Sequence, residues 1–377
     1  MFHAWTKPTG LAICAILATA SHALCQGIYY GQREWDGPNN GLMNISTFVF
    51  RDINASGSYD LGDRVFANIA VEMLAPSGVV AVARTNIGGY ANFNASVALA
   101  GAEIPGEGAY SFRVVPPPGW AVTTGNGEQS VSISGLAGAP GDLVADSVPQ
   151  PVGLAAIPEI RGRQDEGDTI IASNASGHTV QAQAAEDGVF RIPASPGPWT
   201  IGNRAIEVGH IPIVLPGDWS AEGRTQGSTK TLGFDDLFVG DEILKVPNGY
   251  GGLQWENWVA VHARFYEGEG YINTAVSDEY VAYTSSGHPT AVLSDVPFDF
   301  LGGYFGVAWS SAEGEILRIR AWRDGALIHS DRFALSAYGP VYFAADYKSI
   351  TRLEFATEHY WQAVADDLRF VTTERAQ

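Results

Sequence analysis

Apolar residues along the chain fall in short runs in which they alternate with polar residues, as at residues 48–50, 65–74 and 110–115. A period of two residues is typical of half-buried β-strands. The 44 glycines and 20 prolines supply turn residues between these runs. Almost no stretch beyond the first 25 residues sustains a helical period. The pattern therefore predicts an all-β chain.

Two passages rich in small and turn-forming residues, at about 135–158 and 216–231, predict linkers. Between them lie pieces whose sizes suit β-sandwiches. We expect a transthyretin- or immunoglobulin-like N-terminal sandwich at 28–134, a small β module at 150–215 and a jelly-roll-like C-terminal sandwich at 232–372. The middle module is interpreted either as a weaker repeat of the first module or as an interdomain segment packed on its neighbours.

The first 25 residues resemble an export signal, with an apolar stretch from Gly10 to Ala20. Signal cleavage after Ala23 and after Cys25 both remain open. Because Cys14 and Cys25 lie in or beside this segment, disulfides cannot stabilise the body of the chain. No later apolar run approaches the roughly 20 residues needed to span a bilayer. We expect a secreted, extracellular protein without a membrane span, either free or associated with the cell surface.

The formal net charge is −19, from 41 acidic and 22 basic residues, and the basic residues form no cluster along the sequence. Nucleic-acid binding depends on neutralising phosphates with Lys and Arg, so nucleic acid is not an expected partner. The acidic excess fits solubility outside the cell and cation binding.

Residues 52–63 have the spacing of a calcium loop, with oxygen-bearing side chains at alternating positions and Gly57 at the sharp turn. A hard cation takes about six to eight oxygens, and the alternate side chains of a tight loop converge on one point. The predicted calcium ligands are Asp52, Asn54, Ser56, Ser58 through its carbonyl, Asp60 and Asp63. The alternative is a polar hairpin, rich in Asx turns, without metal.

Five segments in order carry a family resemblance: residues 48–52, the loop 52–63, the strand 69–74, the turn 88–90 and residues 111–120. Together, over about residues 46–122, they resemble the B-type repeats of the serine-aspartate repeat surface proteins of Gram-positive bacteria. The resemblance implies a transthyretin-like sandwich stabilised by calcium and used as a stalk or spacer. The chain has one clear copy, no serine-aspartate tract and no LPxTG motif, so we do not expect the family's covalent wall anchoring.

The C-terminal piece opens with residues 233–237 and closes with residues 365–370, and this pattern resembles uncharacterised jelly-roll domains of exported proteins. The first and last strands of a jelly roll often lie close together. That arrangement would bring together four carboxylates as a second metal cluster: Asp235, Asp236, Asp366 and Asp367. Carboxylates so placed either bind a cation or face apart into solvent, and both readings remain open.

Large aromatic residues crowd the same piece: Trp255, Trp258, Tyr266, Tyr271, Trp309, Trp322, Tyr338, Tyr342, Tyr347, Tyr360 and Trp361. A sandwich of this size buries most such rings in its core. Any rings that stay exposed on a β-sandwich provide flat surfaces for sugar rings, as in carbohydrate-binding modules.

Sequence motifs for catalysis are absent, including the nucleophile elbow, the zinc helix, the Walker loop and the dinucleotide turn. Six histidines beyond the signal are scattered singly: His178, His210, His262, His288, His329 and His359. We predict no catalytic residues and no organic cofactor. The first hypothesis is a non-catalytic, calcium-stabilised scaffold, adhesion or ligand-display protein, with a polysaccharide or a surface protein as partner. The alternative is a polysaccharide-active enzyme, which needs only two carboxylates a set distance apart, or its carbohydrate-binding part.

Overall fold

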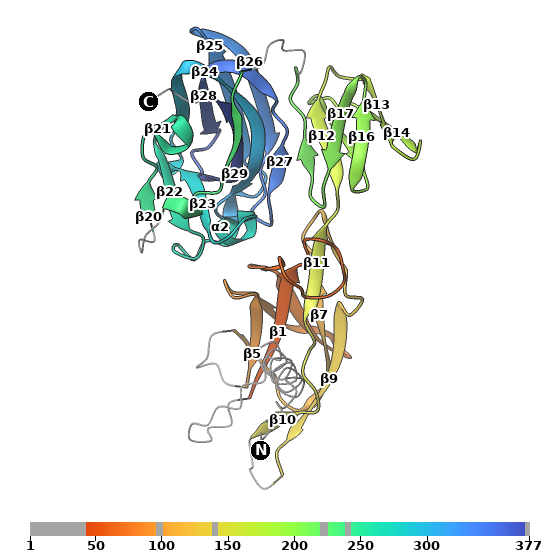
Figure 1. The fold of residues 1–377 in the computed structure, drawn as a ribbon. Helices are drawn as coiled ribbons and strands as arrows, with labels where there is room; N and C mark the ends of the chain where they lie inside the picture. Colours follow the sequence, from red (N-terminus) through yellow and green to blue (C-terminus); the bar gives the residue numbers. More distant parts are fainter. Residues whose placement is uncertain (1–42, 96–100, 138–141, 219–224, 238–242, 374–377) are drawn as a thin grey trace, which may run out of the picture.

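The computed structural model describes residues 43–95, 101–137, 142–218, 225–237 and 243–373. The predicted signal segment, residues 1–25, lies outside them. The all-β prediction is confirmed, because strands make up 55% of the structure and helices 6%. Figure 1 shows an N-terminal sandwich, a small middle module and a larger C-terminal sandwich.

The N-terminal sandwich consists of two sheets packed face to face. One sheet has the order β6-β5-β1-β11-β8, with β2 beside β1, and the other has the order β10-β9-β7-β3-β4. The strands are β1 (Asn44–Arg51), β2 (Arg64–Val65), β3 (Ala70–Ala75), β4 (Gly78–Arg84), β5 (Tyr90–Asn94), β6 (Ala102–Glu103), β7 (Gly108–Val115), β8 (Trp120–Val122), β9 (Glu128–Gly135), β10 (Leu143–Ala145) and β11 (Val152–Ala156).

Alternation in β7 shows why these residues form half-buried strands. Tyr110, Phe112 and Val114 point into the core between the sheets, whereas Arg113 faces solvent and pairs with Glu72. Successive strand residues point to opposite faces, so this pattern buries one face only.

The passage predicted as the first linker contains strands of this sandwich. β11 pairs in parallel with β1, and Val152 and Leu154 are fully buried. Its small residues serve packing rather than flexibility: a Cβ on Gly153 would lie 2.7 Å from the ring of Phe50. The glycine signal was therefore misread, because a close approach inside a sheet also requires glycine.

The middle module is a small sandwich with its own core around Phe190 and Trp199. Its strands are β12 (Glu159–Arg163), β13 (Thr169–Asn174), β14 (Thr179–Gln183), β15 (Val189–Pro193), β16 (Gly197–Ile201), β17 (Arg204–Val208) and β18 (Ile213–Val214). β18 pairs in parallel with β12 and also with β27 of the C-terminal sandwich. The middle module therefore shares a continuous sheet with the C-terminal sandwich.

The C-terminal sandwich is organised around β24, an 18-residue strand with bulges that pairs with β28 along its first part and with β29 and β27 along its second. Its strands are β19 (Ser228–Leu232), β20 (Ile243–Lys245), β21 (Gln254–Glu256), β22 (Trp258–His262), β23 (Tyr280–Thr284), β24 (Thr290–Val307), β25 (Ile316–Arg323), β26 (Ala326–Ala334), β27 (Val341–Phe343), β28 (Tyr347–Thr357) and β29 (Ala363–Thr372). The helices are α2 (Glu269–Thr274) and the 3-10 turns η1 (Asp235–Leu237), η2 (Tyr250–Gly252), η3 (Ser285–Gly287) and η4 (Ser310–Ala312). No helix among the described residues is long and apolar enough to cross a membrane.

The last strand, β29, pairs with β19, with Leu232 opposite Leu368. The predicted opening strand at 233–237 is wrong, because residues 235–237 form the 3-10 turn η1 and the pairing strand lies just before it. β19 begins inside the second predicted linker. A Cβ on Gly227 would lie 2.2 Å from the carbonyl oxygen of Thr372, so the glycine before β19 permits close approach to β29. A fragment that began at residue 232 would lack almost all of this strand.

The N-terminal sandwich meets the C-terminal sandwich at the end of α2, a contact that we call the closed junction. Arg51, 3% exposed, donates hydrogen bonds to the carbonyl oxygens of Asn273 and Ala275 at 2.5 and 2.6 Å. The Asn273 amide donates to the Ala67 carbonyl and accepts from the Ala67 N–H, both at 3.1 Å. Arg64 adds a hydrogen bond to the Val276 carbonyl at 3.2 Å. Side chains of each sandwich therefore hydrogen-bond to the backbone of the other here, while the buried Nε of Arg51 has no partner among the described residues.

Candidate functional site

The predicted calcium loop connects β1 to β2. Its first residue, Asp52, is 2% exposed, and its two carboxylate oxygens accept the backbone N–H groups of Ser56 and Gly57 at 2.9 and 2.8 Å. Gly57 has a φ of 77°, which a side chain would strain. These bonds fold the loop back on itself at its sharp turn.

Oxygen atoms from the middle of the loop meet at one place. The Ser56 hydroxyl lies 2.9 Å from a carboxylate oxygen of Asp60 and 3.1 Å from the Ser58 carbonyl. The Asn54 amide nitrogen lies 3.2 Å from Asp60. Three of the six predicted ligands, Ser56, Ser58 and Asp60, therefore bring oxygen atoms together, as a hard cation requires. Asn54 presents its nitrogen at this place, because its amide oxygen accepts the Ser56 N–H at 3.0 Å.

Asp63, the last predicted ligand, holds the other end of the loop. Its carboxylate accepts the N–H groups of Ile53 and Asp60, both at 2.9 Å. Burial, with smaller contributions from the Asp60 and Asp52 charges, raises the pKa of Asp63. A nearby cation would favour the ionised carboxylate and relieve this repulsion. The loop's donor set thus fits calcium, whose binding stays a prediction.

No group of three or more His, Cys, Asp or Glu side chains close enough to hold a metal occurs among the described residues, and this applies to Asp52, Asp60 and Asp63 of the loop as well as to the second predicted cluster. In the second predicted cluster, each of the four carboxylates instead accepts hydrogen bonds from the protein. Asp235 accepts the N–H groups of Glu279 and Tyr280, and Asp236 accepts the Tyr250 hydroxyl. These two carboxylates act as local hydrogen-bond acceptors on different partners.

The remaining two members of that cluster bind the segment after α2. Asp366 is fully buried and accepts the N–H groups of Val276 and Ser277 at 2.7 and 3.1 Å, while Asp367 accepts the Ser277 hydroxyl at 2.8 Å. Burial raises the pKa of Asp366 to about 8. A Cβ on Gly233 would lie 3.2 Å from Asp367 and 3.5 Å from Asp235, so the fold does bring these two carboxylates toward one another.

Only four of the eleven aromatic residues predicted to be mostly core are buried, and phenylalanines supply most of the other core rings of the C-terminal sandwich. Four are nearly inaccessible, at 3% exposure or less: Trp255, Trp258, Tyr271 and Tyr347. Trp322 is partly exposed and lies under the guanidinium groups of Arg320 and Arg352. The rings that bury most apolar surface are therefore unavailable for binding.

Exposed rings lie in two loops of the sandwich, one after β22 and one after β28, and we call them the aromatic surface. Its exposed members are Phe265 (40%), Tyr266 (36%), Tyr360 (65%) and Trp361 (37%). Tyr266 lies 5.5 Å from buried Tyr271, ring centroid to ring centroid. Tyr271 and the partly exposed Trp309 are linked to the loop of Trp361 through Gln362.

Gln362 is the polar centre of the aromatic surface. Its side-chain oxygen accepts the Tyr271 hydroxyl at 2.8 Å and the Trp309 indole N–H at 3.3 Å. Because an indole N–H can only donate, the oxygen must face Trp309 and the amide nitrogen must face away. Within the described chain that nitrogen has no hydrogen-bond partner, so two donors remain for a ligand.

Sequence reasoning identified Tyr266, Tyr360 and Trp361 only as members of a crowded set, and it missed Phe265 and Gln362. Phe265 precedes Tyr266 in a loop, outside any alternating strand pattern. Two adjacent aromatic residues in a loop were the available signal, since such residues have no regular core face to occupy.

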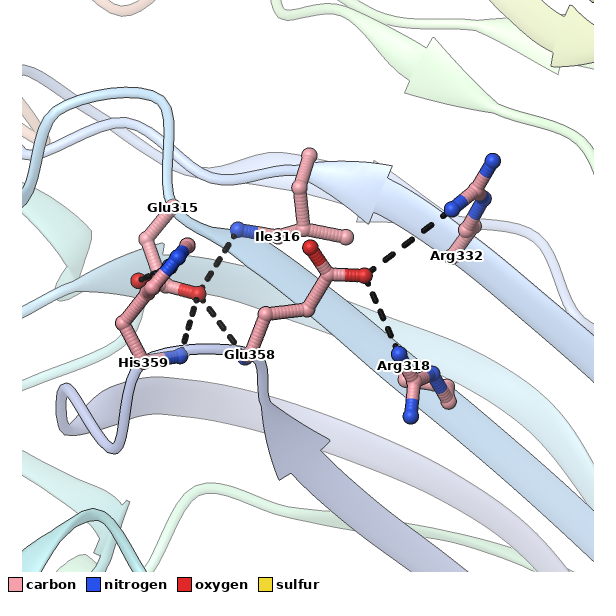
Figure 2. A network of polar contacts seen from close by, with 6 residues as sticks. All are labelled: Glu315, Ile316, Arg318, Arg332, Glu358 and His359. Atoms are coloured by element: carbon pink, nitrogen blue, oxygen red, sulfur yellow. Dashed lines mark hydrogen bonds and ion pairs between the residues drawn. The ribbon is translucent and has the colours of Figure 1, made fainter.

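Two of the described histidines contact carboxylates, and one is His262, whose ring lies 3.2 Å from Glu279. Figure 2 shows His359, whose ring lies 3.1 Å from the Glu315 carboxylate. That carboxylate also accepts the N–H groups of Ile316, Glu358 and His359, at 2.8 to 3.2 Å. Glu315 is 6% exposed and fully engaged in holding a strand end. The pair is structural.

Comparison with known proteins finds no matching family model and no matching curated protein. Among solved structures, the chain aligns with the minor pilin of Streptococcus agalactiae at 11% identity and a TM-score of 0.19, covering 45% of this chain and 92% of the pilin. A putative adhesin from Bacteroides ovatus aligns at 10% identity and a TM-score of 0.20, covering 44% of this chain and 75% of the adhesin.

A third alignment is with a Clostridium perfringens structure that contains a carbohydrate-binding module in complex with GlcNAc. It has 12% identity and a TM-score of 0.21, and covers 52% of this chain and 36% of that one. Likeness at these scores decides nothing about function. The functional conclusion therefore rests on this chain's own residues.

Proposed function

We propose that the protein is a non-catalytic, extracellular ligand-display protein whose C-terminal sandwich binds carbohydrate through the aromatic surface. The observation that carries the proposal is the exposure of Phe265, Tyr266 and Trp361 around Gln362, in a sandwich that buries most of its other large rings. Exposed rings offer apolar faces to the C–H groups of sugars, and the Gln362 amide adds directional hydrogen bonding.

The N-terminal sandwich acts in this proposal as a calcium-stabilised spacer. The convergence of oxygen atoms from Ser56, Ser58 and Asp60 supports calcium binding between β1 and β2. The closed junction then holds the spacer against the C-terminal sandwich, so that the aromatic surface is presented from a defined position. Attachment to a cell surface by this chain or by a partner fits the same role.

The test is a neutral-glycan array on the full chain, followed by affinity measurement for any glycan bound. Trp361→Ala and Tyr266→Ala should each weaken binding roughly tenfold or more, since an interface aromatic contributes over 1 kcal/mol when truncated. Trp322→Ala is the matched control. Trp322 lies opposite Arg352, at the end of β25 that is away from Glu358 and the loop that follows it. No binding, or equal losses in all three variants, would contradict the proposal.

A further inference from the structure

A cleft of about 610 Å³ lies between the middle module and the C-terminal sandwich. Buried Val214, Leu215 and Phe343 line it at the sheet that the two modules share. Its rim carries four arginines: Arg161, Arg163, Arg191 and Arg332. The sequence shows 22 basic residues without a cluster, but folding gathers four of them here. We call this feature the arginine cleft.

Strand geometry places three of these arginines together. On β12, Arg161 and Arg163 share one face, while Ile160 and Gly162 face inward. The register of β12 with β15 sets Arg191 directly opposite Arg161. Like charges directly opposite one another destabilise a strand pair.

One carboxylate, Glu159, offsets the repulsion between Arg161 and Arg191. It contacts Arg161 and lies 3.0 Å from Arg191. Two guanidinium groups thus share a single carboxylate. Arg163 makes its hydrogen bond to the backbone carbonyl of Asp187 and not to the Asp187 carboxylate.

On the opposite wall of the cleft, two arginines again share one carboxylate. Arg332 on β26 lies 3.9 Å from Glu358, whose same oxygen is 3.0 Å from Arg318 (Figure 2). The Arg332 side chain is 51% exposed and that of Arg191 is 55% exposed. Both guanidinium groups therefore keep donors available to a ligand in the cleft.

The carboxylates that line the cleft are already hydrogen-bonded. Asp331 accepts the Gly217 N–H at 2.6 Å and the Tyr347 hydroxyl. Asp187 accepts the Val189 N–H at 2.9 Å. Four arginines line the cleft with these two aspartates, and the glutamates that pair with the cleft arginines, Glu159 and Glu358, each serve two guanidinium groups. The spare guanidinium donors, rather than a net positive charge, favour an anionic ligand with acceptor oxygens in the cleft.

A second hollow of about 450 Å³ continues the cleft and shares Arg161 and Arg191 with it. Trp120 and Pro118 of the N-terminal sandwich line this second hollow, so all three modules contribute to the combined groove. Guanidinium forks match carboxylate and sulfate groups bidentately. Trp120, partly buried with its ring centroid 4.5 Å from that of Phe66, and exposed Pro118 supply apolar surface that suits the C–H groups of a sugar. Glu159 and Glu313 line the same hollow.

We propose that the arginine cleft binds an acidic polysaccharide, with the arginines holding its carboxylate or sulfate groups. The site shares no residue with the aromatic surface, so it stands independently of the proposed function. An acidic peptide is the competing ligand, and its chemistry lacks the apolar sugar face that Trp120 would contact.

The experiment measures binding of the full chain to polygalacturonate, dextran sulfate, neutral dextran and poly-glutamate at several salt concentrations. We expect salt-sensitive binding to at least one of the two acidic polysaccharides, and none to neutral dextran. Arg191→Ala/Arg332→Ala should weaken it about a hundredfold, at roughly tenfold per arginine. The matched control Arg113→Ala/Lys245→Ala removes the same charge from exposed positions that line neither hollow.

Melting temperatures of both double variants establish that they are folded, and Arg191→Glu alone provides a second test that should also abolish binding. Equal losses in the two double variants would show only a nonspecific charge effect and would overturn the proposal. Failure of both acidic polysaccharides to bind would also overturn it. So would poly-glutamate binding that is as tight as polysaccharide binding and equally sensitive to the cleft substitutions.

Discussion

The two junctions of the C-terminal sandwich are both built on arginine, and they differ in burial. At the closed junction Arg51 is 3% exposed and donates to backbone carbonyls at the end of α2. In the arginine cleft, Arg191 and Arg332 leave about half of their side chains in solvent and share carboxylates with other arginines. A buried arginine whose terminal nitrogens donate to protein carbonyls, as those of Arg51 do, acts as an internal link. An arginine with spare donors is available to a ligand.

Electrostatics at the closed junction support this distinction. Burial, together with the Arg64 charge, lowers the pKa of Arg51 to about 9, so the guanidinium stays charged at neutral pH. Carbonyl oxygens at a helix C-terminus carry partial negative charge and favour a cation. Removing Arg51 would leave those carbonyls buried without their donors.

The largest expected effect is therefore at the closed junction. Arg51→Met should lower the free energy of unfolding by roughly 3 kcal/mol, the scale for removing a buried charged partner. Denaturant unfolding of the full chain, followed by tryptophan fluorescence and circular dichroism, measures it. A loss below about 1 kcal/mol would mean that the two sandwiches do not depend on this contact.

Calcium should stabilise the protein next to the closed junction, because the predicted calcium loop begins at Asp52, directly after Arg51. At calcium a hundredfold above its dissociation constant, a site present only in the folded state adds about 2.7 kcal/mol. Melting of the full chain with calcium and with chelator measures the shift. Asp60→Ala should remove it and leave the metal-free protein nearly unchanged, because Asp60 is exposed.

Asp52→Ala is a less specific test, because it also removes the two N–H contacts at the turn of the loop. Identical melting of the wild-type chain in calcium and in chelator would identify residues 52–63 as a polar hairpin. Magnesium should substitute poorly, since it prefers a tighter octahedral shell and gives up its waters reluctantly.

The pH dependence of stability should come from the buried carboxyl near the closed junction. Burial raises the pKa of Asp366 to about 8, so its folded form holds a proton that the unfolded chain has lost above pH 4 to 5. Stability is then fully present at low pH and falls as pH rises through 8, by about 1.4 kcal/mol between pH 7 and 9. Unfolding free energies at both pH values should show this fall in wild type and not in Asp366→Asn.

The smallest effect is expected in the arginine cleft. Arg191→Met, chemically the same change as Arg51→Met, should alter stability by less than about 0.5 kcal/mol, as exposed substitutions usually do. The same denaturant measurement compares the two directly. A loss as large as that of Arg51→Met would show that the cleft arginines are structural, and would remove the contrast between the junctions.

The local pattern of apolar and polar residues was sufficient to predict the strand-rich fold. The alternation at Tyr110, Phe112 and Val114 predicts one buried face whatever packs against it. The oxygen spacing of residues 52–63 likewise predicts a loop whose polar groups converge, since neighbours along a tight turn cannot separate. The resemblance to jelly-roll domains led us to expect the two ends of the C-terminal piece close together, but it placed the opening strand at 233–237 instead of 228–232.

Contacts between distant residues were decided only by the tertiary structure. Gly153 looks like linker sequence until the ring of Phe50 is placed against it. Arg161 and Arg332 are 171 positions apart, and only the sheet shared through β18 brings them to one cleft. Burial depends on what the rest of the chain packs against a residue, so no local pattern distinguishes the buried cation at Arg51 from the exposed one at Arg191.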